Sequence, residues 1–87
     1  QFKLAGTFMY FQLFIVTVFS TQVDVYSFGV LLCEMCIREL PDPDRRDEQV
    51  AMVTNGVLRA LIRGCLQQDA EKRPSMEEII NELEQPT

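Results

Sequence analysis

The stretch Asp24–Ile37 reads DVYSFGVLLCEMCI and decides the fold. Only Ser27 and Glu34 are polar after its first residue, and on a helix they share one narrow stripe. Asp24 can accept hydrogen bonds from the first free amides, so we expect a helix over about 24–38 that is capped by this side chain. A helix that is apolar around nearly its whole circumference is typical of the middle of a domain. We therefore expect this helix to be central and to need neighbours that a chain of 87 residues can hardly supply.

Three more helices are expected downstream, at about 47–54, 57–68 and 75–84, so the predicted fold class is all-α. The last of them has the clearest signal, because Ser75-Met76-Glu77-Glu78 forms a capping box directly after Pro74.

The connections between these helices are read from their turn residues. Leu40–Arg46, LPDPDRR, contains two prolines and alternating charge, which predicts an exposed connecting loop. Asp47 is expected to cap the short helix that follows this loop. Asn55 and Gly56 tolerate the left-handed conformation, so we expect them to end that helix. Arg59 and Arg63 lie four residues apart and could bind a phosphate together, although a solvated helix face is the stronger interpretation.

Composition excludes several classes of function. The net charge of -5 and the pI near 4.5 argue against nucleic acid as a partner, because binding a phosphate backbone needs clustered positive charge. The chain contains no histidine, which removes the commonest general base and the commonest zinc ligand. Its four glycines are too scattered for a loop that cradles phosphate on backbone amides.

The three cysteines favour a reducing compartment, because an odd number leaves one unpaired in a closed disulfide framework. A cytoplasmic location is therefore expected. Cys33 and Cys36 have the Cys-x-x-Cys spacing of a metal or redox pair, but their neighbours are apolar and no second pair follows. We interpret these two residues and Cys65 as core thiols.

The apolar run Phe8–Phe19, FMYFQLFIVTVF, admits two interpretations. It is too short to span a bilayer, so membrane insertion is not expected. It has the length of a signal-peptide core, which leaves open a small secreted helical protein with a leader ending near Ser20. The alternative is a buried strand or helix of a larger domain, which would aggregate when exposed.

Four segments in order resemble one family, the eukaryotic protein kinases. They are Gly6–Tyr10 (GTFMY), Asp24–Leu32 (DVYSFGVLL), Glu39–Pro41 (ELP) and Leu66–Met76 (LQQDAEKRPSM). The chain resembles the C-terminal third of the kinase C-lobe, and the DVYSFG version is similar to the tyrosine kinase and tyrosine-kinase-like groups. The resemblance implies a truncated domain in which residues 1–10 end the activation loop, 11–20 form an atypical apolar segment and 21–87 form the helical C-lobe.

The resemblance also assigns roles to four residues. Gly6 and Thr7 match the segment that lies under the acceptor residue of a substrate. Asp24 matches the acid that hydrogen-bonds the backbone of the catalytic loop. Arg73 matches the arginine that pairs with the glutamate of an Ala-Pro-Glu motif, but this chain has Phe11–Phe14 at that place and no acid before Asp24. Because an unpaired buried guanidinium is costly, we expect Arg73 to be exposed or to find another acid.

The functional expectation follows from the motifs that are present and absent. A full-length parent would use ATP and magnesium to transfer phosphate to protein Ser, Thr or Tyr. These 87 residues contain no glycine-rich loop, no His-Arg-Asp and no Asp-Phe-Gly, so we expect no catalytic, cofactor-binding or metal-binding residue and no ATP binding by this chain alone. The alternative is a non-catalytic helical interaction module that docks onto a protein partner or another kinase lobe. On either interpretation, we expect a loosely packed or aggregating chain without a partner.

Overall fold

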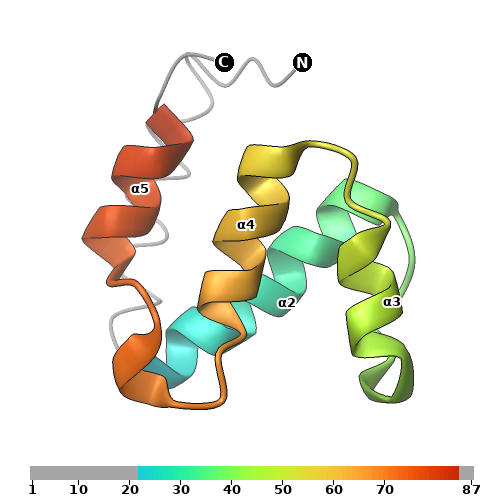
Figure 1. Ribbon diagram of the computed structural model, residues 1–87, viewed down its shortest axis with the longest axis horizontal. Helices are drawn as coiled ribbons and strands as arrows, with labels where there is room; N and C mark the ends of the chain where they lie inside the picture. Colours follow the sequence, from blue (N-terminus) through green and yellow to red (C-terminus); the bar gives the residue numbers. More distant parts are fainter. Residues whose placement is uncertain (1–21, 85–87) are drawn as a thin grey trace.

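The computed structural model describes residues 22–84, and within them the fold is all-α, as predicted (Figure 1). The helices are α2 (Gln22–Ile37), α3 (Arg46–Ala51), α4 (Gly56–Cys65) and α5 (Met76–Glu84), with 3-10 turns η1 (Pro43–Arg45) and η2 (Ala70–Lys72). The predictions made for residues 1–20, including Gly6, Thr7 and the run Phe8–Phe19, lie outside the described residues.

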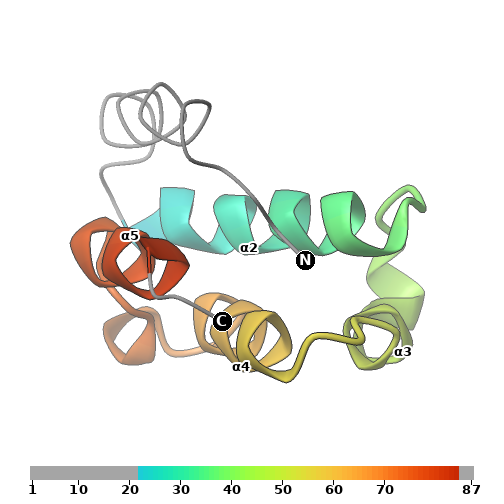
Figure 2. The ribbon, with the colours of Figure 1, turned by 90° about the horizontal axis from the view of Figure 1, so that it is seen from above.

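The helices form two layers. Helix α2 makes one layer, and α5, α4 and α3 lie side by side across it (Figure 2). The core lies between the layers. Its buried side chains are Val25, Phe28, Leu32, Cys33, Val50, Val53, Leu61, Ile62, Cys65, Met76, Ile79 and Ile80.

Gly29 of α2 lies close to Cys65 of α4. A Cβ placed on Gly29 would lie 2.6 Å from the Cβ of Cys65, which is closer than two carbon atoms can pack. Glycine is therefore required at this crossing because it has no side chain. Sequence alone did not identify this contact, since it joins residues from distant parts of the chain.

Helix α2 is central, but its predicted start was wrong. It begins at Gln22, which places Asp24 within the first turn instead of at the N-cap. A carboxylate is stabilised at either position, because the amides of the whole first turn carry partial positive charge. The helix ends at Ile37, and Arg38 follows in the left-handed conformation with φ 59°, its N–H donating to the Glu34 carbonyl at 2.7 Å.

The two faces of α2 differ in burial. Phe28 and Leu32 are buried in the core, whereas Leu31 and Met35 are 36% and 47% exposed. Two large apolar side chains of α2 are therefore partly exposed to solvent, and the expectation that this helix needs further neighbours stays a prediction.

The predicted loop before α3 contains regular structure. The Asp42 side chain caps η1 by accepting a hydrogen bond from the Asp44 N–H at 3.0 Å. Helix α3 follows directly and begins at Arg46, so Asp47 lies in its first turn and does not cap it. Proline at the first position of a helical turn is favourable, because its missing N–H would have had no partner there. The sequence predicted only a loop from Pro41 and Pro43, whereas Pro43 begins a 3-10 turn.

Gln49 of α3 holds the preceding loop in place. Its side chain is 2% exposed, and it both donates to the Leu40 carbonyl and accepts from the Asp42 N–H at 2.9 Å. The buried amide is satisfied at both ends, which removes the cost of taking it out of water.

Asn55 has the opposite role to the one predicted. It does not end α3 in the left-handed conformation: its φ is −76°, and its side chain caps α4 by accepting from the Val57 and Leu58 N–H groups, both at 3.0 Å. Asparagine suits both ends of helices, so the sequence signal was ambiguous. Helix α4 ends at Cys65, three residues before the predicted boundary of 68.

The capping box of α5 is confirmed. The Ser75 hydroxyl accepts from the Glu78 N–H at 3.1 Å, and the Glu78 carboxylate accepts from the Ser75 N–H at 2.9 Å. Both partners lie within four consecutive residues, which is why the sequence sufficed to predict them.

Candidate functional site

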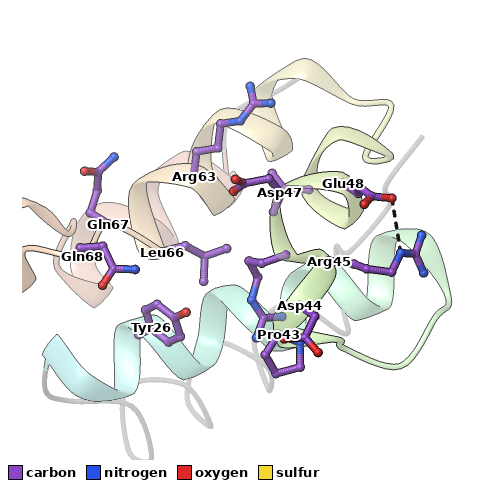
Figure 3. Close-up of a pocket in the computed structure, with 12 residues that line it drawn as sticks. Tyr26, Pro43, Asp44, Arg45, Asp47, Glu48, Arg63, Leu66, Gln67 and Gln68 are labelled. Atoms are coloured by element: carbon purple, nitrogen blue, oxygen red, sulfur yellow. Dashed lines mark hydrogen bonds and ion pairs between the residues drawn. The ribbon is translucent and has the colours of Figure 1, made fainter.

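The candidate site is a groove of about 890 Å³ that opens where α2, α3 and α4 meet (Figure 3). Tyr26 of α2 forms one wall, and Leu66 at the end of α4 lies opposite it. The segment from Pro43 to Glu48, which covers η1 and the start of α3, closes a third side. The groove therefore depends on three segments that are brought together only by folding.

The charges around the groove are of both signs. Arg45 is held by Glu48 at 3.4 Å and approaches Glu39 at 4.0 Å. Arg46 and Arg63 add two further guanidinium groups to the lining. They are opposed by carboxylates from Asp44 and Asp47 as well as by Glu48. A lining of this kind suits a polar protein segment better than a bare anion.

Arg63 and Arg59 do not act together. The Arg59 guanidinium donates to the Val53 carbonyl at 2.7 Å, whereas Arg63 lines the groove. The interpretation of these two arginines as a joint phosphate site is therefore not supported, and the solvated-face interpretation fits the exposed Arg63 but not the half-buried Arg59.

Arg73 lies beside Tyr26 at one side of this region. Its Nε donates to the Gln67 carbonyl at 2.7 Å, and its Nη2 approaches the Gln68 carbonyl at 3.4 Å. The guanidinium carbon is 5.0 Å from the centre of the Tyr26 ring, which is within range of a cation–π interaction. Arg73 is half-buried, and backbone carbonyls are among its acceptors; the expectation that it is exposed or pairs with another acid stays a prediction. Backbone acceptors have no sequence signature.

The other predicted site residue in the described range is Asp24. It is half-buried in the first turn of α2, two residues before Tyr26 on the same helix. The role that the resemblance gives it, holding the backbone of a catalytic loop, stays a prediction.

The core-thiol interpretation is confirmed for Cys33 and Cys65, which are 3% and 0% exposed, while Cys36 is only half-buried. All three thiols are free. Burial raises the pKa of each, that of Cys65 to about 12 in spite of the opposing charge of Arg73. A thiol with a raised pKa is a poor nucleophile and a poor metal ligand at neutral pH.

Residues 22–84 contain neither a candidate metal site nor a candidate membrane span. No group of three or more His, Cys, Asp or Glu side chains in this range could hold a metal ion. No helix within the same range is both long and apolar enough to cross a membrane.

Comparison with known proteins decides the family. The family model for protein tyrosine and serine/threonine kinases matches residues 4–83, which is nearly the whole chain. The chain belongs to this kinase family. The resemblance inferred from the four sequence segments is thereby confirmed at the level of the kinase domain. No solved structure matches the chain.

Three relatives illustrate the range of kinases to which the chain is similar. A probable serine/threonine-protein kinase of Dictyostelium discoideum is 38% identical over 75% of this chain and 8% of its own length. A putative insulin-like peptide receptor of Hydra vulgaris is 36% identical over 77% of the chain and 5% of its own. A protein kinase and PP2C-like domain-containing protein of Arabidopsis thaliana is 27% identical over 94% of the chain and 17% of its own.

This kinase chain thus spans only a small part of each relative. The match to the Arabidopsis protein extends over 114 residues, which is more than the 87 residues of the chain. That relative therefore has residues within the matched region that this chain lacks.

Proposed function

We propose that the chain is the C-terminal helical part of a protein kinase catalytic domain, whose full-length parent transfers phosphate from ATP to Ser, Thr or Tyr of proteins in the cytoplasm. The observation that carries the proposal is the kinase family match over residues 4–83. The segment Asp24–Leu32, DVYSFGVLL, favours the tyrosine kinase or tyrosine-kinase-like groups within this family. In this proposal α2 is the central helix on which the rest of the kinase lobe is built.

The proposal includes catalytic inactivity of the chain alone. Phosphoryl transfer depends on positioning and electrostatic stabilisation by a phosphate-covering loop, a lysine and metal-binding carboxylates. The 87 residues contain no histidine, so a His-Arg-Asp sequence occurs nowhere among them. Their four glycines include no glycine-rich loop. We expect no ATP or magnesium cofactor to bind to this chain.

Two assays test the proposal. Purified chain is titrated with a fluorescent ATP analogue and magnesium, and release of phosphate from ATP is followed in parallel. We expect no saturable binding and no turnover above buffer. Metal-dependent turnover that copurifies with the chain would contradict inactivity. Phosphorylation of Ser, Thr and Tyr peptides by the full-length parent tests the kinase assignment independently, and a parent that phosphorylates none of them would contradict it.

A second function, a non-catalytic interaction module, is favoured by one observation. Leu31 and Met35 on α2 are 36% and 47% exposed although the helix has few polar residues. Neighbouring apolar side chains left uncovered are a common sign of a protein contact. The partner would be a protein, such as another kinase lobe, and not a nucleic acid. Co-purification of the chain with a separately expressed kinase lobe, lost on Leu31→Lys and Met35→Lys substitution, would favour this function over a chain without partners.

A further inference from the structure

A second groove, of about 750 Å³, lies between α4 and α5 on a part of the surface that the kinase assignment leaves without a role. Its floor includes Gly56, Ala60 and Gly64, which are spaced four residues apart and so share one face of α4. Val57, at the start of the same helix, also lines the groove and is 51% exposed. The floor is therefore apolar and accessible over more than two turns of helix.

The floor is open because no side chain among residues 22–84 fills it. A Cβ on Gly64 would meet Pro74 at 3.6 Å, an ordinary contact distance, and one on Gly56 would approach only the Arg59 guanidinium, at 3.7 Å. These glycines differ from Gly29, where an added Cβ would clash. With small residues on its floor, the groove can admit a second helix at a short interaxial distance.

The rim of the groove carries more acidic than basic side chains. Glu71 comes from η2, and Glu78 and Glu82 come from successive turns of α5. The Glu78 carboxylate accepts a hydrogen bond in the capping box, whereas no ion pair or hydrogen bond of the Glu71 or Glu82 carboxylate occurs among residues 22–84. Lys72 and Arg73 are the two cations in the lining, so three carboxylates face two positive charges.

Helix α5 adds to this negative field. It carries four glutamates and no basic residue, in the sequence MEEIINELE. A field of one sign attracts partners of the opposite charge and disfavours others.

We propose that the groove between α4 and α5 docks a basic amphipathic helix of a partner protein. The apolar face of that helix lies on Val57 and Ala60, and its lysine or arginine side chains face Glu71 and Glu82. Charge complementarity selects a basic partner over a second copy of this chain, whose net charge is -5. This proposal is independent of kinase activity, because the residues that carry it all lie in α4, η2 and α5.

The test uses the full chain and a fluorescein-labelled peptide of about 16 residues, made of alanine, leucine and lysine with the leucines on one helical face. Fluorescence anisotropy at about 50 mM salt gives the dissociation constant, and the titration is repeated at higher salt. A peptide with glutamate in place of every lysine is the charge control.

Two matched pairs of variants locate the binding. Glu82→Lys reverses a rim charge, and Glu84→Lys makes the same change in the same last turn outside the groove lining. Ala60→Lys places a long cationic side chain on the floor of the groove. Ala51→Lys is its control, because it makes the same substitution at an exposed alanine of α3, outside the groove. We expect the groove variants to weaken binding about fivefold or more and their controls less than about twofold. Circular dichroism checks that each variant has the same helix content as the unsubstituted 87-residue chain.

The other outcomes overturn the proposal. Equal weakening by the groove variants and their controls would show general attraction to an acidic chain. Absence of saturable binding, or equal binding of the glutamate peptide, would show that the groove does not select a basic helix.

Discussion

Both the inner and the outer face of α2 carry large apolar side chains, but only those of the inner face are fully packed. Phe28 and Leu32 are 0% and 2% exposed in the core shared with α4, whereas Leu31 and Met35 are 36% and 47% exposed on the other side. The difference shows that composition alone does not determine burial: a side chain is buried only where another element lies against it. Among residues 22–84, the inner face belongs to a packed core and the outer face stays partly exposed to solvent.

The largest expected effect comes from truncating the inner face. Phe28→Ala removes a fully buried ring and leaves a cavity, which should cost about 3–5 kcal/mol in the free energy of unfolding. Urea denaturation followed by circular dichroism measures this cost. Met35→Ala is the matched control on the outer face, and an equal loss for both variants would show that the two faces are packed alike.

The contact between α2 and α4 gives the next effect. Gly29→Ala places a Cβ 2.6 Å from that of Cys65, so the helices must move apart at a cost of about 1–3 kcal/mol. Gly64→Ala is the control, because its Cβ meets only Pro74 at 3.6 Å. We expect Gly64→Ala to be neutral or slightly stabilising, since alanine favours helix over glycine. If Gly29→Ala has the same melting temperature as Gly64→Ala, then α2 and α4 do not pack as closely at Gly29 as the structure indicates.

Alkaline pH tests burial at the same contact. The pKa of Cys65 is raised from 9.0 to about 12, so between these values the unfolded chain loses its thiol proton while the folded chain keeps it. The contribution to stability is complete below pH 9 and falls as the pH rises towards 12. At about pH 10 the loss should approach about 1.4 kcal/mol, and Cys65→Ala should flatten this dependence. Urea melts at several pH values measure it, and an unchanged slope in the variant would argue that Cys65 is not buried.

The smallest effect on stability is expected on the outer face. Leu31→Lys and Met35→Lys should change the free energy of unfolding by no more than about 0.5 kcal/mol, because both side chains already meet solvent. The same changes should lower self-association of the chain, measured by sedimentation velocity. A loss of several kcal/mol would mean that this face is packed in the free chain.

The parts of the fold that sequence predicted well are those with local causes. The capping box of Ser75 and Glu78 lies within one turn, and the apolar content of α2 is visible in any window of its sequence. Errors arose where one residue type fits two roles, as Asn55 does at either end of a helix. Asp24 is a related case, because a carboxylate anywhere in the first turn is favourable and does not fix the starting residue.

The candidate site was harder to predict than the fold. The four functional positions came from the resemblance, and the structure describes only Asp24 and Arg73 among them. The groove that contains Tyr26 draws its walls from three separate segments, so no pattern along the chain could indicate it. Two acceptors of Arg73 are backbone carbonyls, which every residue possesses.

The buried amide of Gln49 has a consequence for motion of the loop before α3. It ties the backbone at Leu40 and Asp42 to α3 through two hydrogen bonds of 2.9 Å. Movement of this loop away from α3 would break both bonds together and leave the carboxamide without partners. The loop is therefore no hinge against α3, and residues 40–51 should open to hydrogen exchange as one cooperative unit.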